Sequence, residues 1–326
     1  MTGASFVKRF AITGLHYYRN FELTFTDSIV ILVGENGLGK TTVLNILDAV
    51  LKGRWQLLGS IGFDIVEIEF RDGRKIRFTH SELDCYLILS NYDRKNERNS
   101  DILRKFTQLE SEYGDLVDKF VRIEQLSDEI LRENPILYLP AVRNLREDLR
   151  VVGLDLERVQ AYFKRSFFSE FSRMKKDWFI PTDLDYLTSI LDKPYDDNSI
   201  RLFVQTCNEY LVNTSIAWDI QKKKFGIVNK LTGERIISQQ LSSGEQQIIY
   251  IFFHIYLSGH ERLGILFDEP ELSLSLSWQR KILTDIVSSE RCSFLFAITH
   301  SPFTFDNDLV SYAKGINVCF KTGAWE

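Results

Sequence analysis

Several marks of specialised proteins are missing from this sequence. Its four cysteines (Cys85, Cys207, Cys292 and Cys319) are scattered and form no CxxC pair, which argues against a disulfide framework or a zinc site. The N-terminus, MTGASFVKRF, has no apolar signal core, and the longest apolar run, residues 248–257, is too short to span a bilayer. We therefore expect a cytoplasmic protein with no membrane partner.

An excess of positive charge is also missing. The formal net charge is −5, from 40 Lys and Arg against 45 Asp and Glu. A balance of this sign gives no general reason to expect binding to nucleic acid or to an anionic membrane. The hydrophobic share of 44% is ordinary for a globular protein, and 326 residues suffice for one large or two modest domains.

What the sequence does contain is an α/β pattern at both ends of the chain. Near the N-terminus, apolar runs predict strands at 6–12, 21–25 and 28–33, then a Gly-rich loop, a helix at 40–51 and a hairpin at 64–78. The closing third alternates helix and strand, with strands at 263–267 and 294–298, which is typical of a parallel sheet. We expect the two ends to share one mixed sheet, with the early strands and hairpin forming an antiparallel β annex.

The middle of the chain is helical and charged, so we place domain boundaries at 1–84, 85–205 (a helical insertion) and 206–326. Within the insertion an apolar a/d heptad seam predicts a helix that ends before Pro135. This seam is compatible with a helix packed on its own domain or with a short coiled-coil-like hairpin that meets a partner, and both interpretations stay open. Its residues are Ile102, Phe106, Leu109, Tyr113, Leu116, Phe120 and Ile123.

The stretch GENGLGKT, residues 34–41, matches the phosphate-binding pattern G-x-x-x-x-G-K-[ST] directly after a predicted strand and at the start of a helix. Backbone N–H groups of such a loop surround phosphates, the lysine reaches the β- and γ-phosphate oxygens, and the hydroxyl of Thr41 binds Mg²⁺. The pattern therefore predicts a site for ATP and Mg²⁺. The predicted nucleotide-binding residues here are Gly34, Asn36, Gly37, Gly39, Lys40, Thr41 and Thr42.

Two further stretches end predicted strands in groups that suit phosphate chemistry. In ILFDEPE, Asp268 can hold Mg²⁺ together with Thr41, and Glu269 can take a proton from the attacking water. In AITHSP, His300 follows a strand at the edge where open α/β sheets bind ligands, which makes it a candidate γ-phosphate sensor. Lys40, Glu269 and His300 are thus the predicted catalytic residues.

A second anion-suited turn, LSSGEQQ, opens the apolar helix that follows residue 241. Helix N-termini present N–H groups and a partial positive charge, so Ser242 and Gly244 are candidates for phosphate contacts. The spacing by itself shows only a turn that would accept an anion.

Taken in this order, GENGLGKT, LSSGE, ILFDEPE and THS resemble the ABC-type ATPases, specifically the SMC, RecF and OLD-like branch. The resemblance covers essentially the whole chain. It implies an α/β P-loop fold whose two ATPase lobes, 1–84 and 206–326, flank the helical insertion. It also implies that Ser242 and Gly244 close over the ATP of a second subunit, so that a homo-oligomer is built on dimers that sandwich ATP.

A closer resemblance lies in DEPELSLSLSWQRKIL and THSPFTFDNDL, which are similar to the stand-alone ATPase subunits of PARIS-type anti-phage systems. This implies a switch that controls a separately encoded nuclease or toxin, with a phage-encoded trigger. Ser243 stands where relatives usually have glycine, and Ser275 where many OLD-like proteins have histidine. No glutamine could be placed in a Q-loop: Gln56 and Gln108 both lie poorly for it.

An alternative function is that of a DNA-repair ATPase of the RecF or SMC type. Basic residues gather at Arg143, Arg146 and Arg150, and again among aromatic residues at 163–179. Such a mixture can bind single-stranded nucleic acid, or it can be an amphipathic helix with its charges in solvent. The sequence contains no nuclease domain that we can identify, and DNA binding stays an open alternative.

Overall fold

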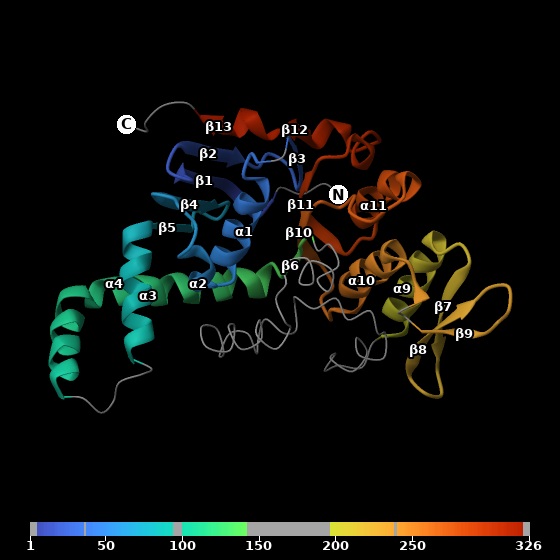
Figure 1. The fold of residues 1–326 in the computed structure, drawn as a ribbon, viewed down its shortest axis with the longest axis horizontal. Coiled ribbons are helices and arrows are strands. Elements are labelled where there is room, and N and C mark those ends of the chain that lie inside the picture. The colour runs from blue at the N-terminus through green and yellow to red at the C-terminus, as the bar shows by residue number, and fades with distance from the viewer. Residues whose placement is uncertain (1–4, 36, 94–99, 142–195, 238–239, 322–326) are drawn as a thin grey trace, which may run out of the picture. The chain divides into compact units, whose positions relative to one another are not determined.

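The computed structural model describes residues 5–35, 37–93, 100–141, 196–237 and 240–321 (Figure 1). The chain divides into two compact units, which are treated one at a time. The first unit comprises Met1–Tyr138, Arg262–Asp268 and Val287–Glu326, and the second comprises Leu139–Glu261 and Glu269–Ile286. None of the helices in the described ranges combines the length and the apolar character needed to cross a membrane.

The first unit contains a five-stranded sheet drawn from both ends of the chain, in the order β12-β3-β11-β10-β6. Its pairs β12–β3, β3–β11 and β11–β10 are parallel. All six residues of β10 are buried, as expected for a parallel strand covered on both faces. The predicted shared sheet is confirmed. Its strands are β3 (Ile29–Val33), β6 (Ile136–Leu139), β10 (Leu263–Asp268), β11 (Cys292–Thr299) and β12 (Ala313–Gly315).

The predicted antiparallel annex is a second five-stranded sheet, in the order β13-β2-β1-β4-β5. Residues alternate between a buried apolar face and a charged face, as in β4, where Val66, Ile68 and Phe70 are buried. The helices α1 (Lys40–Leu51) and α2 (Trp55–Leu58) contribute to the same core. The strands are β1 (Val7–Leu15), β2 (Arg19–Thr24), β4 (Ile65–Phe70), β5 (Lys75–Thr79) and β13 (Phe320–Lys321).

The predicted heptad seam lies on one long helix, α4 (Ser100–Glu133), which follows α3 (His80–Asp93). From residue 114 onward its side chains are described, and there the seam packs on the core of its own unit. Phe120 is fully buried, stacks on Tyr86 at 4.4 Å between ring centroids, and meets Trp55 edge to face at 5.3 Å. For this half of the helix, the interpretation as a helix packed on its domain is correct.

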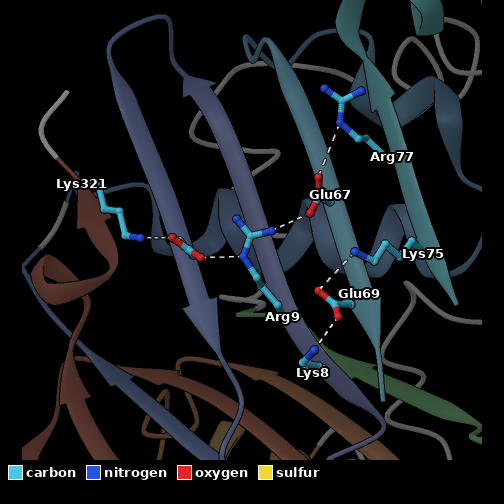
Figure 2. Close-up of polar contacts among 8 residues, drawn as sticks. Lys8, Arg9, Glu67, Glu69, Lys75, Arg77 and Lys321 are labelled. Carbon is cyan, nitrogen blue, oxygen red and sulfur yellow. Dashed lines mark hydrogen bonds and ion pairs between the residues drawn. The ribbon is translucent and has the colours of Figure 1, made fainter. Parts of the chain in front are cut away.

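The charged face of the antiparallel sheet carries a ladder of ion pairs (Figure 2). Arg9 lies at its centre and donates to Glu22 at 2.5 Å and to Glu67 at 2.6 Å. Lys321 pairs with the other side of Glu22, and Arg77 lies 3.5 Å from Glu67. Burial opposes ionisation of Glu22, yet the hydrogen bonds from Lys321 and Arg9 hold its pKa below the ordinary value. The ladder thus joins all five strands through alternating charges.

We expect Arg9→Met to lower the free energy of unfolding by about 1–3 kcal/mol, because it removes two charge-assisted hydrogen bonds from a side chain that is only 24% exposed. Arg77→Met is the matched control: its side chain is 55% exposed, and the pair should contribute less than about 1 kcal/mol. Urea denaturation of both variants measures the difference. Equal losses would contradict a central role for Arg9.

The second unit combines helices with a small antiparallel sheet in the order β7-β8-β9. Ile216, Phe225 and Ile227 fill its buried face, and Phe225 meets Phe203 of α9 edge to face at 5.1 Å. The helix α10 is apolar almost all round and correspondingly buried. The elements are α9 (Asp197–Tyr210), β7 (Thr214–Asp219), β8 (Lys224–Asn229), β9 (Arg235–Ile236), α10 (Ser243–Leu257) and most of α11 (Leu276–Ser288).

The outer edge of β7 is closed by a side chain. The amide of Asn208, on α9, donates to the carbonyl of Ile216 at 2.9 Å and accepts from its N–H at 2.7 Å. These are the two bonds that another strand would make with this residue. A single asparagine therefore occupies the hydrogen-bonding groups at the middle of this edge strand.

Candidate functional site

The predicted phosphate loop connects β3 to α1 in the first unit. Gly37 and Gly39 have φ values of +79° and +81°, in the left-handed region that favours glycine, and Gly39 is the residue from which α1 starts. At Gly34 an added Cβ would lie 2.6 Å from the Cγ2 atom of Ile316, so only glycine fits beside that side chain. Asn36, also predicted to bind nucleotide, lies outside the described residues.

The start of α1 is well suited to a phosphate. Its first turn contains no acidic residue, and no side chain caps its N-terminus, so the positive end of the helix dipole is not compensated from within the helix. Lys40 is 5% exposed, and its ammonium donates to the carbonyls of Gly34 at 2.8 Å and Glu35 at 2.6 Å. The lysine is thus held over the loop that precedes it. Thr41 is exposed and Thr42 half-buried in the same turn.

Strand register brings Asp268 and His300 to the same edge of the sheet as this loop. Val33, the last residue of β3, is level with Thr299, and Leu32 is level with Ile298, which in turn is level with Asp268. Neighbouring strands lie about 4.8 Å apart, so Asp268 is about 10 Å from Leu32 across the sheet. The carboxyl ends of three parallel strands therefore present the loop, a histidine and a carboxylate side by side.

A network of hydroxyl groups fixes the backbone around His300. The hydroxyl of Thr304 donates to the carbonyl of Ser301 at 2.8 Å and lies 3.1 Å from the hydroxyl of Thr299. The hydroxyl of Thr299 in turn accepts from the N–H of Ser301 at 3.0 Å. Thr299 and Thr304 are fully buried. His300, half-buried, is therefore carried on a turn whose backbone is held by side-chain hydrogen bonds.

Sequence reasoning missed a further residue at this edge, Tyr138 on β6, the strand beside β10. Its hydroxyl donates to Oδ1 of Asn45, on α1, at 2.6 Å. Burial, together with the negative charges of Asp268 and Asp48, raises the pKa of Tyr138 above its ordinary value. Tyr138 thus stays protonated and ties the edge strand to the helix that follows the phosphate loop. The only sequence signal for it was its place in the short strand before Pro140.

The donor set at this edge fits Mg²⁺. Thr41 offers a hydroxyl and Asp268 a carboxylate, both hard oxygen ligands, and Mg²⁺ in nucleotide sites typically takes one or two protein ligands, with phosphates and water completing its shell. Asp268 is 1% exposed, and a carboxylate buried to this extent is stabilised by a nearby cation. Thr41 and Asp268 would hold the ion.

Glu269, the predicted base, belongs to the second unit and has an unusual backbone. Its φ is +48°, in the left-handed region, which costs a residue with a Cβ about 1–2 kcal/mol. The turn that begins here is closed by a bond from the N–H of Leu272 to the carbonyl of Glu269 at 3.0 Å. Strain of this kind, at a residue that is neither glycine nor asparagine, is a feature of functional sites, where it aims a side chain.

The second predicted anion turn, at the start of α10, differs from the first because it already has an internal carboxylate. The hydroxyl of Ser242 accepts from the N–H of Glu245, and the carboxylate of Glu245 accepts from the N–H of Ser242 at 2.9 Å, which is a complete capping box. Thr214 on β7 donates to the same carboxylate at 2.8 Å. Ser242 and Ser243 are both exposed, whereas Gly244 is buried.

Gly244 in this turn is required by a close approach. An added Cβ would lie 2.6 Å from the carbonyl oxygen of Ser273 and 3.2 Å from the ring of Trp278. Ser273 itself has a φ of +61°. The turn after Asp268 and Glu269 therefore packs directly on the start of α10, within the second unit.

Comparison with known proteins places the chain in a family. The family model described as "AAA domain, putative AbiEii toxin, Type IV TA system" matches residues 29–306. No significant match was found among curated proteins.

Three solved structures are similar to this chain at low identity. An Smc head bound to the C-terminal winged-helix domain of ScpA is 12% identical, with a TM-score of 0.42, over 93% of this chain and 91% of that one. An Smc head with an extended coiled coil, bound to the C-terminal domain of ScpA from Pyrococcus furiosus, is 13% identical, with the same coverage and TM-score. The SMC head domain from Thermotoga maritima is 10% identical, with a TM-score of 0.41, over 92% of this chain and 91% of that one.

Proposed function

This chain belongs to the AAA-domain family described as putative AbiEii toxin of type IV toxin–antitoxin systems, and on that premise we propose that it is an ATP-driven switch in anti-phage defence. In this proposal it binds and hydrolyses ATP, and its nucleotide state controls a separately encoded nuclease or toxin. The observation that carries the ATPase assignment is the shared sheet edge, where β3 leads through the phosphate loop into the uncapped start of α1 and β10 ends in a buried carboxylate.

The residues of that edge take distinct roles toward the nucleotide. Lys40 transfers its hydrogen bonds from the loop carbonyls to the β- and γ-phosphate oxygens, and the amides at the start of α1 add further donors. Thr41 and Asp268 would hold Mg²⁺, which when bound would neutralise charge on the phosphates. Thr42 completes the first turn. Together these groups orient the γ-phosphate, and positioning of this kind is most of the catalysis in phosphoryl transfer.

Two residues act on the attacking water and the γ-phosphate. Glu269 accepts a proton from the water, and its strained backbone sets the direction of the carboxylate. His300, on its hydroxyl-braced turn, contacts the γ-phosphate and thereby responds to the difference between ATP and ADP.

The turn at Ser242 and Gly244 serves the nucleotide of a second copy of the chain. Its Ser242 and Ser243 are exposed at a helix start that is held by a capping box, which suits a contact made between subunits. ATP would then be sandwiched in a homodimer, the unit of any larger oligomer. A dimer that forms with ATP and separates after hydrolysis differs in surface between the two states, and a partner can respond only to such a difference.

A separate effector is supported by the family description, which refers to toxin–antitoxin systems. The effector is proposed to be a nuclease or toxin, and the trigger a phage-encoded protein. The helical insertion is the proposed docking surface. Its basic and aromatic stretch at 163–179, together with Arg143, Arg146 and Arg150, lies outside the described residues.

The proposal is tested by expressing the chain alone, its genomic neighbour alone and both together, then challenging each culture with phage. Protection or toxicity should need both genes and should disappear with Lys40→Ala, because the nucleotide can no longer be held. Lys222→Ala is the control, since this lysine is 73% exposed and pairs with Asp219 at the surface. Protection by the chain alone, or nuclease activity of the purified chain, would refute the switch.

A further inference from the structure

One peptide of the phosphate loop has freedom that nucleotide binding cannot tolerate. Leu38 lies between Gly37 and Gly39, both with positive φ, and glycine crosses between backbone regions at little cost. The carbonyl of Leu38 and the N–H of Gly39 belong to one planar peptide and point in opposite directions. If this peptide turned over, a carbonyl would replace an amide on the side where such loops bind phosphate. The loop therefore needs a group that holds the Leu38 carbonyl away.

Arg19, the first residue of β2, is placed to do this. Its Nη1 donates to the carbonyl of Leu38 at 3.4 Å, a long bond but one made by a charged group. The Leu38 carbonyl points toward Arg19, so the N–H of Gly39, in the same peptide, points away from it. A turned-over peptide would bring an N–H toward the guanidinium, which has no acceptor.

Two aromatic rings hold the guanidinium in place. Its central carbon lies 4.8 Å from the ring centre of Tyr18 and 5.3 Å from that of Phe320. Contacts of a guanidinium with aromatic faces at this range are favourable. Arg19 is thus positioned by a neighbour in sequence and by a residue three hundred positions away.

The Tyr18 side of this arrangement depends on a strained turn. His16 and Tyr17 have φ values of +52° and +69°, although neither is glycine or asparagine. The turn is held by a bond from the N–H of His16 to the carbonyl of Gly62 at 2.7 Å, and the Tyr17 ring packs on Gly62, where an added Cβ would be 2.5 Å away. Strain maintained by the surroundings in this way marks a turn whose geometry matters.

The Phe320 side depends on the segment Ala313–Lys321, which joins the two sheets of the first unit. At one end β12 pairs with β3 so that Gly315 is level with Val33, and Ile316 packs on Gly34 of the phosphate loop. At the other end β13 pairs with β2, and the rings of Phe320 and Phe21 meet edge to face at 5.8 Å. The segment therefore contacts the phosphate loop directly and also supplies the ring behind Arg19.

We propose that Arg19 is a positioning residue that locks the Leu38–Gly39 peptide in the orientation that presents the Gly39 amide to phosphate, and that Tyr18 and Phe320 hold Arg19 there. This rests on the proposed function, because the lock has a purpose only in a nucleotide-binding loop. The lock acts equally on the ground state and the transition state, so loss of the lock raises KM for ATP and leaves kcat nearly unchanged.

The test measures the Kd of the Mg²⁺ complex of a non-hydrolysable ATP analogue by calorimetry, together with kcat and KM for ATP. Arg19→Ala should weaken binding by about 5- to 30-fold, and Phe320→Leu by about threefold, the range expected for charge-assisted and cation–π contacts. Phe320→Tyr keeps the ring and should bind as the wild type does. In the double variant Arg19→Ala/Phe320→Leu, the second change should cost nothing further.

Controls separate the lock from general effects. Arg77→Ala removes a cation from the far strand of the same sheet and should leave Kd unchanged. Thermal melting of each variant identifies loss of folding, and Phe320→Leu, which keeps an apolar side chain, remains informative if Arg19→Ala unfolds. If the wild type binds the analogue and the Kd of both Arg19→Ala and Phe320→Leu is unchanged, the lock alone is overturned. Failure of the wild type to bind the analogue, or unchanged binding by Lys40→Ala, overturns the proposed function and the lock with it.

Discussion

Purified Glu269→Gln protein should bind ATP as tightly as the wild type and hydrolyse it about 10²- to 10⁴-fold more slowly, the usual cost of removing a positioned base. Glutamine has nearly the same shape and meets the same backbone constraint at a φ of +48°, so the turn on Ser273 and Gly244 should be preserved. What is lost is the ability to accept a proton. Phosphate release measures turnover, and equilibrium binding measures affinity.

Glu271→Gln is the matched control for this variant. Glu271 lies in the same turn, two residues further on, and its carbonyl accepts from the N–H of Leu274 at 3.1 Å. Its neutralisation removes the same charge from the same segment and should leave turnover within about twofold of the wild type, as expected for a carboxylate outside the reaction. Near-normal hydrolysis by Glu269→Gln, or an equal loss in both variants, would show that Glu269 is not the base.

Mixing two inactive variants should restore activity if the site is completed by a second subunit. Lys40→Ala removes the lysine of the phosphate loop, and Ser243→Arg places a large charged side chain at the second turn, so each homodimer has two defective sites. A mixed dimer combines both defects in one site and leaves the other intact. An equimolar mixture should therefore recover about a quarter of wild-type turnover, because half of the dimers are mixed and each has one complete site.

Ser243 is preferable to Ser242 for this experiment because of the capping box. A change at Ser242 would remove the bond to Glu245 and cost about 1 kcal/mol of helix stability, which would confuse loss of structure with loss of contact. If differential tagging shows that mixed dimers form and the mixture is still inactive, a contribution of this turn to the site of the other subunit is excluded.

Much of the fold could be predicted because local and long-range signals agree. The helix predicted at 40–51 is α1 with the same bounds, since the Gly-rich loop fixes its start and the apolar pattern its length. The parallel strands were recognisable as continuous apolar runs, as in LGILFD, where both faces are buried. The strand β7, TSIAWD, was missed, because its alternation is weak and its stability comes from α9 and β8.

The C-terminal strands could not be predicted from local sequence. Ala313–Gly315 has no apolar run, and Phe320–Lys321 is two residues long, so both exist only through pairing with β3 and β2. Similarly, the positive φ values of His16 and Tyr17 could not be predicted, because neither residue is glycine or asparagine, the usual signals for such a turn. The predicted loop, carboxylates and histidine came from motifs, whereas Arg19 and Tyr138 are recognisable only from contacts.

The two anion turns also show what a motif cannot convey. Both are small-residue turns that open a helix, and in sequence they are alike. In the structure α1 has no acidic residue in its first turn, whereas α10 carries Glu245 there, held by Ser242 and Thr214. A carboxylate at this position competes with an incoming anion. The positive end of α1 is thus left uncompensated by its own first turn, whereas that of α10 already has a carboxylate beside it.

The side chain of Asn208 limits how copies of this chain can associate. A short antiparallel sheet with an open edge invites strands from neighbouring molecules, and such growth has no natural end point. Here any strand arriving at β7 would first have to displace the amide that already satisfies both backbone groups of Ile216. The side chain of Asn208 thereby opposes growth of the sheet from this edge.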